Sequence, residues 1–277
     1  MPKYDNSKLH AARQWETLVR PQAVPSARVP VVAVVLDLPA QSYMPAHEHG
    51  HGRLIHAVDG TIAVICANQS WLLPPHRALW LPPGTVHEMA MRSAARMRSL
   101  DFAPRLGALL PREPFAISVS PLLRALIHRA VDIGTGYGED RHHLALLKAI
   151  PREILLSKRS NITIPFTSDR RLVKVCRSLL AGQDLKQPLD HWADSAGASR
   201  RTLERLFITE TGMTFVQWRQ QALMQLAIGK LVGGASISQV CLDLDIQSTS
   251  AFHRMFRQVF ETTPARYLRE LNAVEQQ

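Results

Sequence analysis

Residues Ser199–Trp218 read SRRTLERLFITETGMTFVQW, and residues Ser248–Tyr267 read STSAFHRMFRQVFETTPARY. Both stretches follow one plan, in which a serine suited to cap a helix comes first and apolar residues then recur at helical spacing. The apolar residues are Leu203, Leu206 and Phe207 in the first stretch and Phe252, Met255 and Phe256 in the second. The pattern predicts two helices of the same design, each with one face fixed to a core.

A short amphipathic segment and a turn precede each of these helices. The first segment, residues 188–198, is PLDHWADSAGA, with Pro188 where a helix begins and Gly197 in the turn. The second, residues 236–246, is SISQVCLDLDI, and it opens on the capping-box pair Ser236 and Gln239. A helix, a tight turn and a second helix with exposed donors form the geometry that enters a major groove. We therefore predict two helix-turn-helix motifs.

Residues 168–270 resemble the DNA-binding domain of the AraC/XylS family of bacterial transcription regulators. The matching motifs occur in the family's order: Trp192-Ala193, Ser199–Leu203, Arg205–Phe207, Gly212–Phe215, Trp218-Arg219, Ser250–Phe252, Arg254–Arg257 and Thr263-Pro264. Asp245 and Glu261 stand where the family usually has glycine, and Leu223 stands where it usually has arginine. The resemblance implies binding to double-stranded DNA, control of nearby genes, and contact with RNA polymerase if the protein is an activator.

The side chains expected to contact DNA lie on the outward faces and first turns of the two helices. They are Ser199, Arg200, Arg201, Thr202, Arg205, Ser248, Thr249, Ser250, His253, Arg254 and Arg257. Arginine donates to guanine edges or to phosphates, and about half of these arginines are expected on phosphates. Glutamate tolerates a left-handed backbone poorly. The second motif is therefore expected to be the weaker reader, and a second motif that no longer binds DNA stays open as an alternative.

Residues 29–104 have the pattern of many short strands separated by proline and glycine turns, with a hairpin signal at Asp59-Gly60. The segments Pro45–His49 and Trp80–His87, with Gly60 between them, resemble the cupin-type sensor domain found in one branch of the same family. The expected fold is multi-domain α+β. It has an N-terminal β-barrel of the cupin or jelly-roll kind with flanking helices, and a C-terminal all-α domain with two helix-turn-helix motifs.

The resemblance implies that His47, His49 and His87 match three histidines that metal-binding cupins use. Arg53 stands about where their acidic ligand falls, and His51 and Glu48 are spare ligands. One interpretation is a divalent metal held by imidazoles; the other is an organic effector bound by His47, His49, Arg53, Trp80 and His87. A guanidinium opposes metal binding, so the sequence favours a metal-free sensor over the alternative of a metal-dependent cupin enzyme.

The remaining segments complete the expected organisation. Residues 1–28 are expected to be an arm, residues 105–160 a helical dimerisation region, and residues 161–167 a linker. Apolar stripes over residues 122–131 and 142–156 suit the interface of a homodimer, although the same stripes suit packing on the barrel.

Composition narrows the class of protein. The net charge of +10 suits a polyanionic partner, although the C-terminal part is only slightly basic. Cys66, Cys176 and Cys241 lie too far apart for a disulfide or zinc motif. The N-terminus lacks the apolar core of a signal peptide, and the longest apolar run, Val29–Leu36, is too short to span a bilayer. We expect a cytoplasmic protein with no membrane partner.

Overall fold

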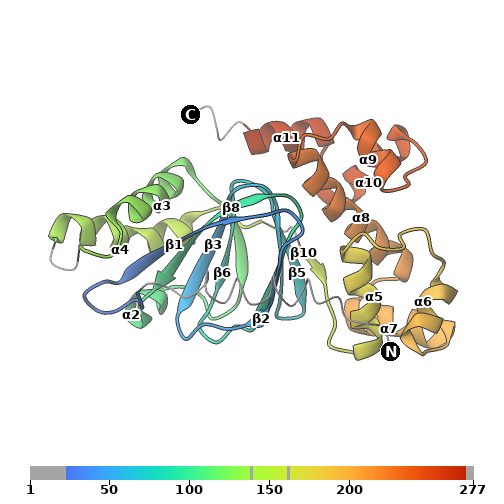
Figure 1. Cartoon of the computed structure of the whole chain (residues 1–277), viewed down its shortest axis with the longest axis horizontal. Coiled ribbons are helices and arrows are strands. Elements are labelled where there is room, and N and C mark those ends of the chain that lie inside the picture. Colours follow the sequence, from blue (N-terminus) through green and yellow to red (C-terminus); the bar gives the residue numbers. More distant parts are fainter. Residues whose placement is uncertain (1–22, 138–139, 161–162, 273–277) are drawn as a thin grey trace. The chain divides into compact units, whose positions relative to one another are not determined.

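The computed structural model describes residues 23–137, 140–160 and 163–272 (Figure 1). Most of the expected arm at residues 1–28 lies outside the described residues. The chain forms two compact units. The first contains residues 1–67 and 73–162, and the second contains residues 68–72 and 163–277. Within the described part of the chain, no helix has both the length and the apolar character that a membrane span requires.

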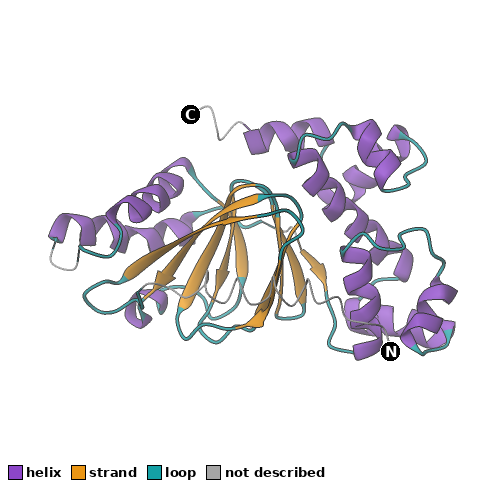
Figure 2. Cartoon of the chain, in the orientation of Figure 1, coloured by secondary structure: helices purple, strands orange, loops and turns teal. Residues whose placement is uncertain are grey.

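The first unit contains a five-stranded antiparallel sheet with the strand order β1-β8-β3-β6-β9. Figure 2 draws the strands in orange and the helices in purple. Its strands are β1 (Val31–Leu38), β8 (Ala95–Phe102), β3 (Gly52–Asp59), β6 (Arg77–Leu81) and β9 (Phe115–Ser118). Strand β9 pairs with β6, although it lies in the region that the sequence predicted to be helical. A four-residue strand between prolines carries too little periodicity to be recognised before its partner is known.

Three more strands of this unit, β4 (Ile62–Cys66), β7 (His87–Met91) and β2 (Tyr43–His47), form an antiparallel set in that order. The turn predicted at Asp59-Gly60 is present, since β3 ends at Asp59 and β4 begins at Ile62. The predicted hairpin is wrong, because β3 and β4 belong to different sheets and do not pair with each other. Gly60 has a φ of +73°, and a Cβ there would lie 2.0 Å from the carbonyl oxygen of Ala94. The strands form two sheets of the jelly-roll kind, which agrees with the expected fold class, and they do not close into one barrel.

Helices α2 (Pro104–Gly107), α3 (Pro121–Ile133) and α4 (Arg141–Leu156) complete the first unit. Ser120 caps α3 by accepting a hydrogen bond from the amide of Leu123. The helices share a core with one face of the five-stranded sheet, in which buried Leu123, Ile127, Leu147 and Ile150 join Leu54, Trp80, Leu100 and Phe102. The two apolar stripes therefore pack on the sheet, which was the alternative interpretation of residues 105–160.

In the second unit, β5 (Gln69–Leu73) pairs with β10 (Thr163–Pro165), and seven helices follow among its described residues. These are α5 (Arg170–Leu180), α6 (Leu189–Ala196), α7 (Arg200–Thr211), α8 (Phe215–Val232), α9 (Ile237–Asp243), α10 (Thr249–Phe260) and α11 (Pro264–Asn272). Helix α8 contacts α5, α7, α9 and α10. Both predicted helix-turn-helix motifs, α6–α7 and α9–α10, are therefore present and are joined by one helix.

Candidate nucleic-acid interface and effector site

The first motif holds α7 by its cap and its buried face. Helix α6 ends at Gly197, which has a left-handed backbone, and the hydroxyl of Ser199 then accepts a hydrogen bond from the amide of Thr202 at 3.2 Å. Leu203 and Phe207 are fully buried, as the sequence predicted. With one face fixed in this way, the opposite face of α7 is presented to solvent.

That exposed face forms a shallow depression on the surface of the second unit. Its lining residues are Arg201, Thr202, Glu204, Arg205, Ile208 and Thr209. Arg201 and Arg205 form no ion pair with another described residue, so their guanidinium groups remain available to a ligand. The face therefore presents two cations, hydroxyl groups and one carboxylate.

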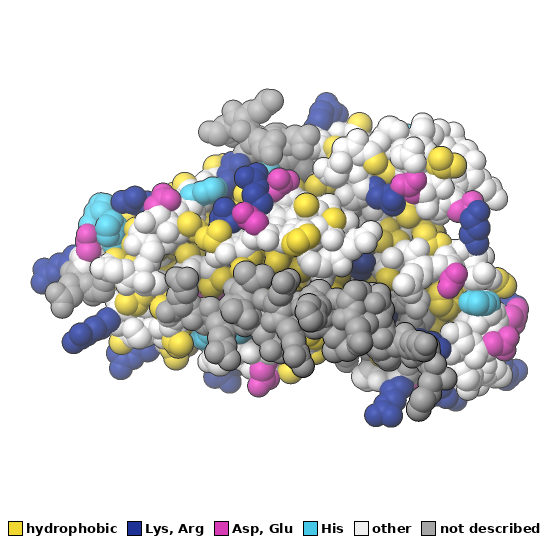
Figure 3. Space-filling view, viewed as in Figure 1, with side chains coloured by type: hydrophobic (Ala, Val, Ile, Leu, Met, Phe, Trp, Pro, Cys, Tyr) yellow, Lys and Arg dark blue, Asp and Glu magenta, His cyan; other side chains and the backbone are white. Residues whose placement is uncertain are grey.

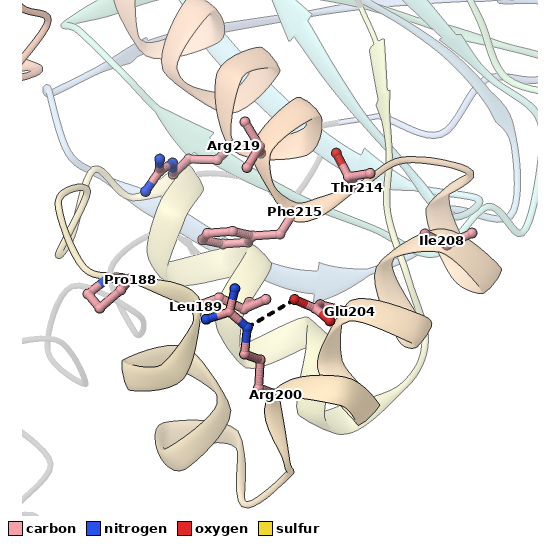
Figure 4. A pocket seen from close by; sticks show the side chains of 9 residues that line it. Pro188, Leu189, Arg200, Glu204, Ile208, Thr214, Phe215 and Arg219 are labelled. Carbon is pink, nitrogen blue, oxygen red and sulfur yellow. Dashed lines mark hydrogen bonds and ion pairs between the residues drawn. The ribbon is translucent and has the colours of Figure 1, made fainter.

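Arg200 behaves differently from its neighbours. Its Nη1 donates to Oδ2 of Asp190 at 2.9 Å and its Nε donates to Oε1 of Glu204 at 3.0 Å. The hydrogen bond to Glu204, followed by the charge of Asp190, raises the pKa of Arg200. Arg200 and Glu204 also line an adjacent cavity of about 400 Å³ together with Leu189 and Phe215. Figure 4 shows the side chains of these four residues and the hydrogen bond between Arg200 and Glu204. Arg200 is thus already paired within the protein.

The second motif repeats this design. Ser248 caps α10 by accepting from the amide of Ala251 at 3.1 Å, and Phe252 and Phe256 are fully buried. The exposed side of α10 has its own depression, lined by Ser250, His253, Arg254, Arg257 and Gln258. Thr249 is also exposed in the first turn. The structure thus gathers the predicted contact residues into two sets, one on each helix.

Net charge does not by itself mark this interface. On the face shown in Figure 3, lysine and arginine side chains are spread singly or in small groups among other residues. The candidate interface is defined instead by the placement of arginines and hydroxyl groups on two capped helices. Glu204 lies among them and was not included in the predicted contact set, because a carboxylate in a basic stretch is usually a solvated partner of a nearby arginine.

In the first unit, the structure brings His47, His49 and His87 together. His47 ends β2 and pairs directly with His87 at the start of β7. His49 lies beyond the end of β2, and its ring centroid is 5.0 Å from that of His47. One ligand atom from each of the three side chains lies within 4.8 Å of the others.

The backbone fixes the orientation of two of these rings. Nδ1 of His47 lies 2.8 Å from the carbonyl oxygen of Pro45, and Nδ1 of His87 lies 2.9 Å from that of Thr85. A carbonyl oxygen only accepts, so Nδ1 carries the hydrogen and Nε2 carries the lone pair. The Nε2 atom of His87, which is 1% exposed, has no hydrogen-bond partner among the described residues.

The imidazoles of the cluster are neutral near pH 7. Burial lowers the pKa of His87 to about 4 against the opposing hydrogen bond to Thr85. Burial and then the charge of Arg53 lower the pKa of His49 to about 3, and burial also lowers the pKa of His47. Neutral imidazoles whose other nitrogen donates to a backbone carbonyl have the arrangement of histidine ligands to a transition metal. The three residues therefore fit a divalent metal.

Arg53 does not act as the free cation that the sequence suggested. Its Nε and Nη2 donate to the two carboxylate oxygens of Asp101 at 2.6 and 2.8 Å, and both side chains are buried. Burial alone raises the pKa of Asp101, but the hydrogen bonds from His51 and Arg53 outweigh it and leave that pKa below its usual value. Arg53 is thus paired with a carboxylate, although its charge still lowers the pKa of His49, and the metal-free site stays a prediction.

Trp80 lies apart from the histidine cluster. Leu54 pairs with Trp80 across β3 and β6 and shares the helix-covered core with it, whereas Arg53, the adjacent residue of β3, points to the opposite face. The Nε1 atom of Trp80 donates to the carbonyl oxygen of Pro111 at 2.9 Å. Trp80 is therefore a core residue of the first unit and not a residue of the effector site. Asp101, which was not predicted from the sequence, lies beside the site through its hydrogen bonds with Arg53.

Comparisons with known proteins agree with the division of the chain into a unit that carries the histidine cluster and a unit that carries the helix-turn-helix motifs. A model of the AraC-like ligand binding domain matches residues 29–160, and a model of the helix-turn-helix domain matches residues 192–270. The HTH-type transcriptional regulator NimR of Escherichia coli (strain K12) is 30% identical over 233 residues, which cover 84% of this chain and 85% of NimR.

Two further similarities cover different parts of the chain. The regulatory protein SoxS of Escherichia coli (strain K12) is 33% identical over 103 residues, which are 35% of this chain and 96% of SoxS. The crystal structure of ToxT from Vibrio cholerae with bound unsaturated fatty acid aligns with a TM-score of 0.38 at 12% identity, and the alignment covers 91% of this chain and 99% of ToxT.

Proposed function

The chain belongs to the AraC family of helix-turn-helix transcriptional regulators, and from that premise we propose how it binds its DNA and its effector. The exposed faces of α7 and α10 contact double-stranded DNA, and a small molecule binds at the cluster of His47, His49 and His87. The observation that carries the proposal is the pair of capped helices that present arginines and hydroxyl groups on their exposed sides.

The contacts divide by chemistry. Arg201, Arg205 and Arg254 have the planar donors that pair with guanine O6 and N7, while Thr202 and Ser250 suit phosphate oxygens or base edges. The hydroxyls of Ser199 and Ser248 cap their helices. We therefore propose that these two residues orient the first turn of each helix toward the phosphates. Thr249, His253 and Arg257 complete the second set.

The histidine cluster is proposed as the effector site. His47, His49 and His87 would hold a divalent metal through their convergent ring nitrogens. When bound, such a metal supplies a positive centre that accepts a further donor from a ligand. Because the relatives are regulators, we propose that the site senses its ligand and does not turn it over. Asp101 pairs with Arg53 and so reduces the positive charge that this guanidinium presents to the cluster.

We propose that the protein forms a homodimer through the helices of the first unit. We also propose that it acts in the cytoplasm, where DNA is present. Leu122 of α3 and Leu155 and Leu156 of α4 are 55%, 46% and 68% exposed, and they supply apolar area to such a contact. Engagement of RNA polymerase follows if the regulator activates transcription.

The first experiment tests DNA binding by footprinting the full-length protein on the DNA that flanks its own gene. We expect a protected site whose affinity falls steeply as salt rises, because arginines displace counterions from the phosphates. An Arg201→Ala/Arg254→Ala double variant should lose the footprint. Arg112→Ala, which removes one exposed arginine of the first unit, is the matched control and should retain it. Equal affinity for every duplex at physiological salt contradicts the proposal.

The second experiment tests the effector site by metal analysis of protein purified without chelator. We expect a stoichiometric transition metal that is absent from a His47→Ala/His49→Ala variant, and a footprint that responds to removal of the metal. Turnover of an organic substrate by the metal-loaded protein would instead support a metal-dependent cupin enzyme. Protein that holds no metal, but whose footprint responds to an organic ligand only when the cluster is intact, restores the metal-free sensor.

A further inference from the structure

The carboxylate of Glu204 occupies an unusual place for an acidic group. It lines the same depression of α7 as Arg201, Thr202 and Arg205, and it also lines the adjacent cavity beside Leu189 and Phe215. A carboxylate on a helix that faces DNA is repelled by the phosphates unless it gains a specific partner. Its position on the reading face therefore requires an explanation.

Arg200 holds this carboxylate in a defined place. The guanidinium donates from Nε to Glu204, as Figure 4 shows, and from Nη1 to Asp190. It therefore links the first turn of α6 to α7 through one cation and two carboxylates. The side chains of Arg200 and Asp190 are each 58% exposed and that of Glu204 is 48% exposed. Exposed pairs of this kind add little to stability, so their value lies in orientation.

The pairing changes what each residue can recognise. A guanine is read by two parallel donors of one guanidinium, and Arg200 already directs two nitrogens to carboxylates of the protein. Glu204 uses Oε1 for Arg200, but a carboxylate has two oxygens with about four lone-pair sites. Acceptor capacity therefore remains on a side chain that lies between Arg201 and Arg205 on the exposed face.

In the major groove, the chemistry of a carboxylate selects one base. Cytosine presents the N4 amino group as a donor, guanine presents two acceptors, and adenine places an acceptor beside its donor. An ionised carboxylate only accepts, so cytosine satisfies it best and guanine repels it. We propose that Glu204 reads a cytosine in the half-site bound by α7 and that Arg200 is a positioning residue that holds the carboxylate toward this base.

This inference rests on the proposed contact between α7 and DNA. The experiment uses the full-length protein and the duplex identified by footprinting, with each base pair of the α7 half-site replaced in turn. Wild type should prefer cytosine at one position by roughly 5- to 150-fold, the range expected for one good side-chain–base pair. Glu204→Gln should move the preference at that position to adenine, because an amide pairs with adenine N6 and N7.

Two further variants separate positioning from direct contact. Arg200→Ala should keep the preference for cytosine but narrow it several-fold, with the other positions unchanged. Asp190→Asn is the matched control: it weakens the outer half of the linkage, leaves the bond between Arg200 and Glu204, and should retain the full preference. Circular dichroism must show that all variants have the unfolding midpoint of wild type.

The outcomes separate a failure of the proposed DNA binding from a failure of the base contact by Glu204. Wild-type protein that binds no specific duplex removes the proposed function and this inference with it. Specific binding without a cytosine preference in the α7 half-site overturns the inference alone. Variants that lower the affinity for all duplexes equally show that Asp190, Arg200 and Glu204 only brace α6 against α7. If Glu204→Gln changes the preferred base and Arg200→Ala has no effect on base preference, the positioning role of Arg200 is overturned.

Discussion

The two helix-turn-helix motifs use the same backbone with different residues at its left-handed positions. In the first motif, Gly197 in the turn and Gly212 at the end of α7 have φ values of 64° and 70°. In the second, Asp245 and Glu261 hold the corresponding positions with φ values of 54° and 55°. A left-handed backbone disfavours residues with a Cβ by about 1–2 kcal/mol. The fold is thus kept at both sites, but only the second motif is strained.

Other contacts of the second motif offset that strain. Phe256 packs against Phe252, Phe260 and Tyr267 with ring centroids 4.6–5.7 Å apart, which ties α10 to α11. Asp245 forms an ion pair with Lys186 at 2.8 Å, but both side chains are more than half exposed and the pair adds little. Aromatic packing therefore does most to hold the second motif. The departures from glycine do not prevent the helix-turn-helix fold, and the extent to which α10 reads bases stays a prediction.

The largest expected difference between the motifs concerns DNA affinity. Arg201→Ala should weaken binding to the operator by about 1–3 kcal/mol, because the residue lies in the first turn of its helix, where side chains reach base edges. Arg257→Ala should weaken binding less than Arg201→Ala does, and by the same factor for every DNA sequence. Arg257 lies in the last turn of α10, where a contact with phosphate is expected. Titration of both variants on one operator checks this order, and the reverse order would show that the second motif is the stronger reader.

The next difference concerns stability. Gly212→Ala should destabilise the second unit by up to about 1 kcal/mol. The new Cβ meets no atom within 4 Å, so the cost comes from the left-handed backbone and is partly offset by the lower conformational freedom of alanine in the unfolded chain. Glu261→Ala is the matched control and should be close to neutral, because one residue with a Cβ replaces another. Urea unfolding followed by circular dichroism measures both. Equal losses at the two positions would mean that Glu261 is held by contacts beyond its backbone.

The helix caps should behave alike in the two motifs. Ser199→Ala and Ser248→Ala each remove a hydroxyl that accepts one amide hydrogen bond, at 3.2 and 3.1 Å respectively. Each should lower the free energy of unfolding by about 1 kcal/mol. The same urea measurement compares them. A much larger loss at Ser248 would indicate that the second recognition helix depends on its cap because its other end is strained.

The sequence predicted these local features because they depend on neighbouring residues. The serine caps, the buried Leu203 and Phe207, and the turn at Asp59-Gly60 all arise from interactions over a few positions, and the structure confirms them. The pairing of the strands beside that turn was not predicted correctly, since β3 and β4 belong to different sheets. Leu172, Val175, Cys176 and Leu179 of α5 follow the same helical periodicity and are buried.

Features set by distant partners were not predicted. Arg53 and Asp101 are 48 positions apart, and nothing near Arg53 shows that a carboxylate on β8 neutralises it. The same limit applies to Arg200, whose partner Asp190 lies on another helix, and to β9, which is recognised only through its pairing with β6. Trp80 was placed in the effector site because it belongs to the segment Trp80–His87 that resembles the cupin motif, but its side chain packs in the helix-covered core of the first unit.

The smallest expected effect comes from restoring glycine to the second motif. Glu261→Gly relieves a left-handed backbone worth about 1–2 kcal/mol, but glycine also gains about 0.5–1 kcal/mol of conformational freedom in the unfolded chain. The net result should be a stabilisation of up to about 1 kcal/mol, with unchanged affinity for the operator if the exposed face of α10 already has its binding geometry. Urea unfolding measures the first quantity and titration on one operator measures the second. A rise in affinity that depends on the sequence of the α10 half-site would show that strain at Glu261 limits base reading by the second motif.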